Sequence, residues 1–179
     1  MNAISQSISD ESIVIALGSN LAGAHGVCEA LLEAALATFP AHGLTVTARS
    51  GWWRSAAWPD PAEPEYRNGV ALVQTTLTPR QTLEALHAIE RVFGRERHEP
   101  NAARTLDLDL IAFGRTVVDQ PGLHLPHPRA HERLFVMGPL AQIAPDWRHP
   151  VSGETAARLA AMASVGADAR PAWATIPSS

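Results

Sequence analysis

Residues 105–113 read T-L-D-L-D-L-I-A-F, a stretch in which apolar and polar side chains alternate. This period of two predicts a half-buried β-strand. Successive side chains of a strand point to opposite faces, so the leucines share one face and the two aspartates share the other. The leucines are Leu106, Leu108 and Leu110, and the aspartates are Asp107 and Asp109.

A well-marked helix precedes this strand. Thr78 is placed as the N-cap, Pro79 occupies the first helical position, and Gln81 completes a capping box. Gly94 predicts where the helix ends. The helix face expected to be buried carries Leu83, Leu86, Ile89 and Phe93.

The earlier part of the chain supplies the remaining elements of the core. Residues 13–17 form a continuous apolar run typical of a buried strand, and residues 26–39 have the apolar spacing of a helix. Residues 44–54 and 66–75 are predicted to be strands. The resulting order is β-α-β-β-α-β, which predicts an α+β ferredoxin-like sandwich with an antiparallel sheet and C-terminal additions.

Length and composition are those of one globular domain, with 179 residues of which 46% are hydrophobic and 18% charged. We predict a single domain over residues 13–165, with flexible tails at 1–12 and 166–179. No apolar run could span a bilayer, and polar side chains stand where a signal peptide would need an apolar stretch. We therefore expect a cytoplasmic protein with no membrane partner. The single cysteine, Cys28, excludes an internal disulfide and fits a reducing compartment.

The charged residues exclude several classes of function. A net charge of −4 argues against nonspecific nucleic-acid binding. All 14 cationic side chains are arginine, so the chain has neither a Walker A loop nor a Schiff-base lysine. An anion site here must be built from arginine, histidine, backbone amides or a metal ion.

The paired aspartates of residues 105–113 are candidate metal ligands. Their α-carbons are separated by two strand rises, about 6.6 Å, and carboxylate oxygen is the ligand type that Mg²⁺ prefers. The alternative is an ordinary solvated strand face. Three arginines in the preceding loop, Arg95, Arg97 and Arg104, could bind phosphate oxygens, so the combination favours a polyphosphate substrate.

Three further positions have both a functional and a structural interpretation. Tyr66 and Asn68 fall on one face of a strand and offer an aromatic plane beside an amide, which fits a flat heterocycle with an amide-like edge. They could equally form a plain sheet edge. His127 lies in a stiff loop between two prolines and could be structural, and Phe135 could be a core residue.

Six short motifs occur in one order along residues 13–150. They read A-L-G-S-N-L at 16–21, Y-x-N-x-V at 66–70, E-R-x-F-G-R-x-R at 90–97, R-T-L-D-L-D-L at 104–110, L-P-H-P-R at 125–129, and R-x-F-V at 133–136 followed by P-L at 139–140. In this order they resemble the 6-hydroxymethyl-7,8-dihydropterin pyrophosphokinases of folate biosynthesis.

The resemblance implies a reaction and its ligands. It implies ATP as the donor, a pterin alcohol as the acceptor, two Mg²⁺ ions bound by Asp107 and Asp109, release of AMP, and a monomer. The ATP-binding positions it implies are Glu90, Arg95, Arg97, Arg104, His127 and Arg133, and the catalytic ones are Arg95, Arg104, Asp107 and Asp109. The pterin-binding positions it implies are Ser55, Trp58, Tyr66, Asn68 and Phe135.

The sequence departs from the family pattern at a few positions, and two other functions stay open. Asn101-Ala102-Ala103 stands where the family commonly has Trp-Gly-Pro, and Ser55-Ala56-Ala57 stands where it usually has Thr-Pro-Pro. One alternative is a paralog that only binds a pterin or a nucleotide. The other is a pyrophosphokinase for a modified pterin, suggested by Trp58 beside the two alanines.

Overall fold

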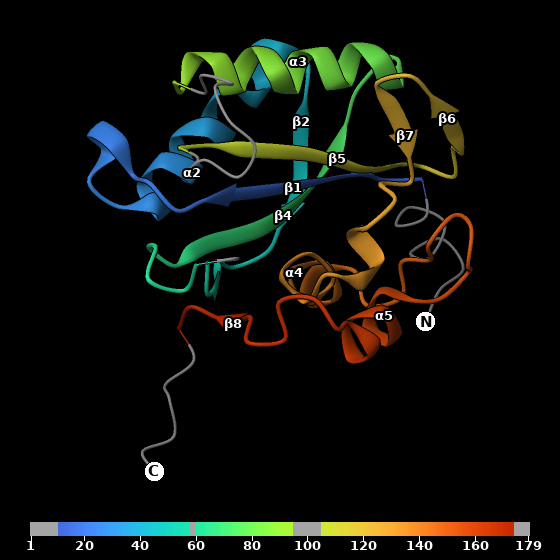
Figure 1. Ribbon diagram of the computed structural model, residues 1–179. Coiled ribbons are helices and arrows are strands. Elements are labelled where there is room, and N and C mark those ends of the chain that lie inside the picture. Colours follow the sequence, from blue (N-terminus) through green and yellow to red (C-terminus); the bar gives the residue numbers. More distant parts are fainter. Residues whose placement is uncertain (1–10, 58–59, 95–104, 174–179) are drawn as a thin grey trace.

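A central antiparallel sheet organises the protein (Figure 1). The structure is a computed structural model that describes residues 11–57, 60–94 and 105–173. The strand order is β5-β1-β4-β3-β8, and β2 pairs with β4 beside this path. The strands are β1 Ile13–Ser19, β2 Thr45–Arg49, β3 Trp53–Ser55, β4 Tyr66–Gln74, β5 Asp107–Phe113 and β8 Arg170–Pro171.

Helices cover both faces of this sheet. In Figure 1, α2 and α3 lie on one side, and α4 and α5 lie on the other. The α-helices are α2 Cys28–Thr38, α3 Pro79–Val92, α4 Leu134–Ile143 and α5 Ala156–Met162, and a hairpin is formed by β6 Val118–Gln120 and β7 Leu123–Leu125. Short 3-10 helices are η1 Gly23–His25, η2 Phe39–His42 and η3 Ala130–Glu132. Among the described residues, none of the helices is both long and apolar enough to cross a bilayer.

The predicted ferredoxin-like core is confirmed. Elements β1, α2, β2 with β3, β4, α3 and β5 follow the order β-α-β-β-α-β, and the sheet places the last strand beside the first. Helix α3 begins as expected, because the Thr78 side chain accepts from the Gln81 amide and the Gln81 side chain accepts from the Thr78 amide. The capping residues predicted from the sequence therefore begin the helix that packs beside β5.

The predicted strand over residues 44–54 is interrupted. Arg49 pairs with Ala71, whereas Trp53 pairs with Asn68, so one extra residue is inserted between β2 and β3. Ser50 sits in the interruption, where its hydroxyl accepts from the Val70 amide at 3.0 Å. After the interruption, β3 pairs with the end of β4 that carries the candidate pterin residues.

Strand β5 also departs from strict alternation. Val14 pairs with Ala112 and Ile15 pairs with Leu110, which leaves Ile111 as an extra residue. Leu110 packs on the α2 and α3 side of the sheet, while Ile111 packs on the α4 side. The Ile111 carbonyl accepts from the amide of His127 at 2.8 Å, so the bulge holds a candidate site residue beside β5.

The C-terminal boundary predicted at residue 165 needs correction. Strand β8 adds an antiparallel strand to β3, with Arg170 opposite Arg54. The amide of Ala172 then donates to the carbonyl of Trp52 at 2.8 Å. Residues 166–173 therefore belong to the packed fold, while residues 1–10 and 174–179 lie outside the described part of the chain.

Helix α4 approaches the sheet closely at Gly138. A Cβ at this position would lie 2.5 Å from the ring of Trp53. We expect Gly138→Ala to lower the free energy of unfolding by about 1–3 kcal/mol, although alanine is the better helix former. Urea denaturation followed by tryptophan fluorescence measures this change, and a stability equal to or above wild type would show that α4 can move away without cost.

Candidate functional site

One row of paired residues crosses the sheet and joins two predicted site residues. Asp107 pairs with Gly18, Gly18 with Asn68, and Asn68 with Trp53. Paired residues of antiparallel strands point to the same face, so Asp107 and Asn68 share a face with their α-carbons roughly 10 Å apart. Because Gly18 has no side chain, nothing from β1 separates them.

This face is the side of the sheet covered by α4. Asp109 pairs with Ala16, which packs in the core formed with that helix. Asp107 and Asp109 are both half-buried, as the alternating pattern predicts. Their neighbours on β1 are the small residues Gly18 and Ala16.

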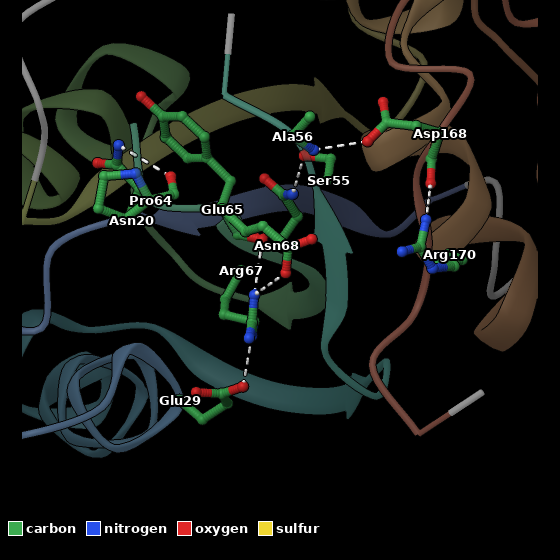
Figure 2. Close-up of polar contacts among 11 residues, drawn as sticks. Asn20, Glu29, Ser55, Ala56, Pro64, Glu65, Arg67, Asn68, Asp168 and Arg170 are labelled. Atoms are coloured by element: carbon green, nitrogen blue, oxygen red, sulfur yellow. Dashed lines mark hydrogen bonds and ion pairs between the residues drawn. The ribbon is translucent and has the colours of Figure 1, made fainter. Parts of the chain in front are cut away.

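The predicted pterin residues of β3 and β4 lie side by side. Ser55 pairs with Tyr66, and the side-chain amide of Asn68 donates to the Ser55 hydroxyl at 3.0 Å (Figure 2). Ser55 and Asn68 are both buried. The hydrogen bond fixes the Asn68 amide with its oxygen toward Gly18, where a Cβ would lie 3.4 Å from that oxygen.

Two residues near this face were not predicted as site residues. Trp53 extends the row of Asp107 and Asn68, and its indole N–H donates to Gln142 of α4 at 3.3 Å. Asn20 is buried, and its amide donates to the Pro64 carbonyl at 3.5 Å (Figure 2). Asn20 belongs to the A-L-G-S-N-L motif, whereas Trp53 could be found only from the strand register.

Glu90 supports the strand that carries the aspartates. Its side chain is buried on α3, and one carboxylate oxygen accepts from the amide of Leu108 at 2.8 Å. Strand β5 is at the edge of the sheet, so this amide has a helix side chain as its partner. Leu108 lies between Asp107 and Asp109, and Glu90 therefore fixes the backbone between the two carboxylates.

His127 is held beside the same strand as a neutral side chain. Burial, followed by the nearby Arg133 guanidinium, lowers the pKa of His127 from 6.5 to about 4, while Asp107 acts in the opposite direction. Its Nδ1 accepts from the amide of Arg129 at 3.2 Å. The proton is therefore on Nε2, which makes that atom a hydrogen-bond donor at neutral pH.

Arg133 and Phe135 stand at the start of α4. The guanidinium carbon of Arg133 lies 5.8 Å from the centroid of the Phe135 ring, within the range of a cation–π contact. Arg133 is the N-cap of α4, and its backbone forms a parallel bridge with Val165. The structure thus brings Arg133 near His127 and keeps Phe135 next to it.

Four predicted site residues lie outside the described part of the chain. These are Trp58, Arg95, Arg97 and Arg104. Their roles stay predictions from the sequence.

The two aspartates fit a magnesium site that a substrate completes. In residues 11–57, 60–94 and 105–173, no group of three or more His, Cys, Asp or Glu side chains could hold a metal ion. Mg²⁺ commonly binds through one or two carboxylates together with substrate phosphates rather than in an all-protein cage. Asp107 and Asp109 on one strand face supply such a pair of hard oxygen donors.

Two histidines should make the fold less stable in mild acid. Burial, with smaller contributions from His131 and Arg115, lowers the pKa of His149, as burial and Arg133 do for His127. Below pH 6.5 the unfolded chain then binds more protons than the folded one, so stability falls as the pH drops from about 6.5 toward 4.

The free energy of unfolding, measured with urea at several pH values, should therefore decrease below pH 6.5. Asn can replace the Nδ1 of His149, which accepts from the amides of Val151 and Ser152. His149→Asn should make the decrease smaller. An unchanged slope in this variant would show that His149 does not contribute to it.

The chain is similar to known proteins of one family. Residues 14–145 match the family 7,8-dihydro-6-hydroxymethylpterin-pyrophosphokinase (HPPK). A 2-amino-4-hydroxy-6-hydroxymethyldihydropteridine pyrophosphokinase of Synechocystis sp. is 42% identical over 147 residues, which cover 82% of this chain and 73% of that protein. The protein of the same name from Pseudomonas aeruginosa is 39% identical over 78% of this chain and 85% of its own.

Solved structures share the fold. The crystal structure of wild-type Plasmodium falciparum HPPK-DHPS with SDX-DHP matches with a TM-score of 0.60 at 13% identity, over 84% of this chain and 43% of that one. This chain therefore spans less than half of the two-part protein. The family match and the relatives show that the chain belongs to the 7,8-dihydro-6-hydroxymethylpterin-pyrophosphokinase family.

Proposed function

We propose that this protein transfers the pyrophosphoryl group of ATP to the hydroxymethyl group of 6-hydroxymethyl-7,8-dihydropterin in folate biosynthesis and releases AMP. The observation that carries the proposal is the row formed by Asp107, Gly18 and Asn68. Carboxylates suited to a metal–phosphate complex stand on the same face as an amide suited to a pterin. Family membership supports this choice of substrates.

The β5 end of the face is the proposed phosphate site. Asp107 and Asp109 would hold Mg²⁺, which when bound neutralises phosphate charge. We assign the Nε2–H of His127 and the nearby guanidinium of Arg133 to the triphosphate as hydrogen-bond donors. Neutral His127 donates one hydrogen bond, and Arg133 adds a positive charge. Glu90 keeps the strand in register while these groups bind.

The β3 and β4 end of the face is the proposed pterin site. The Asn68 oxygen accepts from the N–H edge of the pterin, because its amide nitrogen is already engaged by Ser55. Tyr66 and Phe135 supply aromatic surface for the flat ring. The pterin hydroxymethyl group then points along the row toward Asp107.

The reaction forms one bond and breaks another at the β-phosphorus. The pterin hydroxyl oxygen attacks that phosphorus and loses its proton to solvent water, and the bond to the α–β bridging oxygen breaks as AMP leaves. Negative charge grows on the bridging oxygen during this step. Donors already fixed in place, His127 by the β5 bulge and Arg133 by its bridge to Val165, meet that charge with little reorganisation.

The proposed catalytic unit is one chain in the cytoplasm. ATP as donor and a single cysteine fit a reducing compartment.

Identification of both products tests the proposed function. The protein is incubated with ATP, Mg²⁺ and 6-hydroxymethyl-7,8-dihydropterin, and nucleotides and pterins are separated by chromatography. AMP and a pterin pyrophosphate in equal amounts are expected. ADP as the main nucleotide would refute pyrophosphoryl transfer. Tight binding of both substrates without any product would instead support the paralog that only binds its ligands.

A further inference from the structure

The C-terminal segment 164–173, which we call the clasp, connects two parts of the candidate pterin site. At its start, the amide of Leu134 donates to the Val165 carbonyl at 2.9 Å, and a Cβ at Gly166 would lie 2.5 Å from the Phe135 ring. At its end, β8 pairs with β3. The clasp therefore spans from the start of α4 to the far edge of the sheet.

Between these ends, a side chain of the clasp contacts the residue that follows β3. A carboxylate oxygen of Asp168 accepts from the amide of Ala56 at 2.6 Å (Figure 2). The pairing of β3 with β4 ends at Ser55 opposite Tyr66, so Ala56 is the first residue beyond the ladder. Its amide lies beyond this ladder at an exposed position, where the Asp168 carboxylate accepts from it in a charge-assisted bond.

The position of the Asp168 carboxylate is itself constrained. The Asp168 carbonyl accepts from the Arg170 guanidinium at 3.1 Å (Figure 2), and the amide of Ala169 donates to Gly166 at 2.9 Å. Ala169 is buried and Asp168 is exposed. These two hydrogen bonds hold the backbone around Asp168 in place, so the Asp168 carboxylate can hold the amide of Ala56.

The effect on the site passes through Ser55. This residue precedes Ala56, and its buried hydroxyl accepts from the Asn68 amide. Movement of the Ala56 backbone would move Ser55 and loosen the amide that faces the pterin. Asp107 and Asp109 are on β5, separated from β3 by two strands, so they should be little affected.

We propose that Asp168 is a positioning residue for the pterin, which holds the Ser55–Ala57 backbone through the amide of Ala56. The inference rests on the proposed function, because it assigns the pterin to this end of the face. A bond of this kind also requires an N–H at position 56, which alanine has and proline would lack.

A double-mutant cycle between positions 56 and 168 tests this role. Asp168→Ala should raise the KM for the pterin about tenfold, the equivalent of one charge-assisted hydrogen bond, and change the KM for ATP less than twofold. Asp168→Asn keeps an oxygen acceptor and should recover much of the loss. Ala56→Pro removes the donor, so adding Asp168→Ala to it should have little further effect. Glu84→Ala removes an exposed carboxylate outside the clasp and is the matched control.

The outcomes separate this inference from the proposed function. Equal increases in both KM values, or fully additive effects of Ala56→Pro and Asp168→Ala, would overturn the positioning role and leave Asp168 as a contributor to stability. An unchanged pterin KM in Asp168→Ala, with normal AMP formation, would overturn it as well. If the wild-type protein forms no AMP from ATP and the pterin, the proposed function fails, and the assignment of Asp168 fails with it.

Discussion

Replacement of Asp107 or Asp109 by Asn should lower kcat/KM by about 100-fold or more, roughly 2.7 kcal/mol in barrier, without loss of stability. Both carboxylates are on the α4 face of β5, while Leu108 between them packs in the opposite core. The core on the α2 and α3 side is therefore untouched. Removal of one of two like charges on the same strand face should also relieve repulsion in the protein without metal.

Steady-state kinetics with increasing Mg²⁺ and thermal unfolding without Mg²⁺ check both halves of this prediction. Glu84→Gln is the matched control, because Glu84 is an exposed carboxylate on α3 away from β5. It should leave turnover unchanged. Near-normal turnover in Asp107→Asn or Asp109→Asn, together with a lower midpoint of unfolding, would mean that the aspartates support the fold rather than the reaction.

Glu90→Ala should lower both stability and turnover. The Leu108 amide would lose its acceptor inside the protein, which costs about 1–3 kcal/mol. The same change frees the β5 backbone between Asp107 and Asp109, so kcat should fall with it. Glu90→Gln keeps an oxygen acceptor and should cost less than about 1 kcal/mol.

Urea denaturation and kinetics on the two Glu90 variants decide between two roles. A mild Glu90→Gln and a damaging Glu90→Ala indicate a hydrogen-bond acceptor for Leu108. Equal damage in both variants would contradict that role and show that the negative charge at position 90 is what matters.

The elements set by local chemistry could be predicted from the sequence. Helix α3 depends on Thr78, Pro79 and Gln81, which act within one turn, and the alternation of residues 105–113 is visible without any partner. The interruption between β2 and β3 could not be predicted, because it becomes visible only in the pairing of Arg49 and Trp53 with β4. The β5 bulge at Ile111 likewise depends on pairing with β1.

The candidate site was likewise predictable only where local sequence determines it. The sequence indicated which face of their own strands Asp107 and Asn68 occupy, but their common row requires the register of both strands with β1. Trp53 was missed for that reason. The clasp was missed because residues 166–179 were predicted to be a flexible tail, whereas Pro171 in that segment is compatible with a short edge strand such as β8.

The most direct test of the account follows an ¹⁸O label placed in the hydroxyl group of 6-hydroxymethyl-7,8-dihydropterin. Asp107, Gly18 and Asn68 place the proposed phosphate and pterin sites on one face, so the hydroxyl oxygen should attack the β-phosphorus directly. After a single turnover with ATP and Mg²⁺, mass spectrometry should find the label retained in the pterin pyrophosphate and absent from AMP. Label in the nucleotide, loss of label from the pterin product, or ADP in place of AMP would contradict the account.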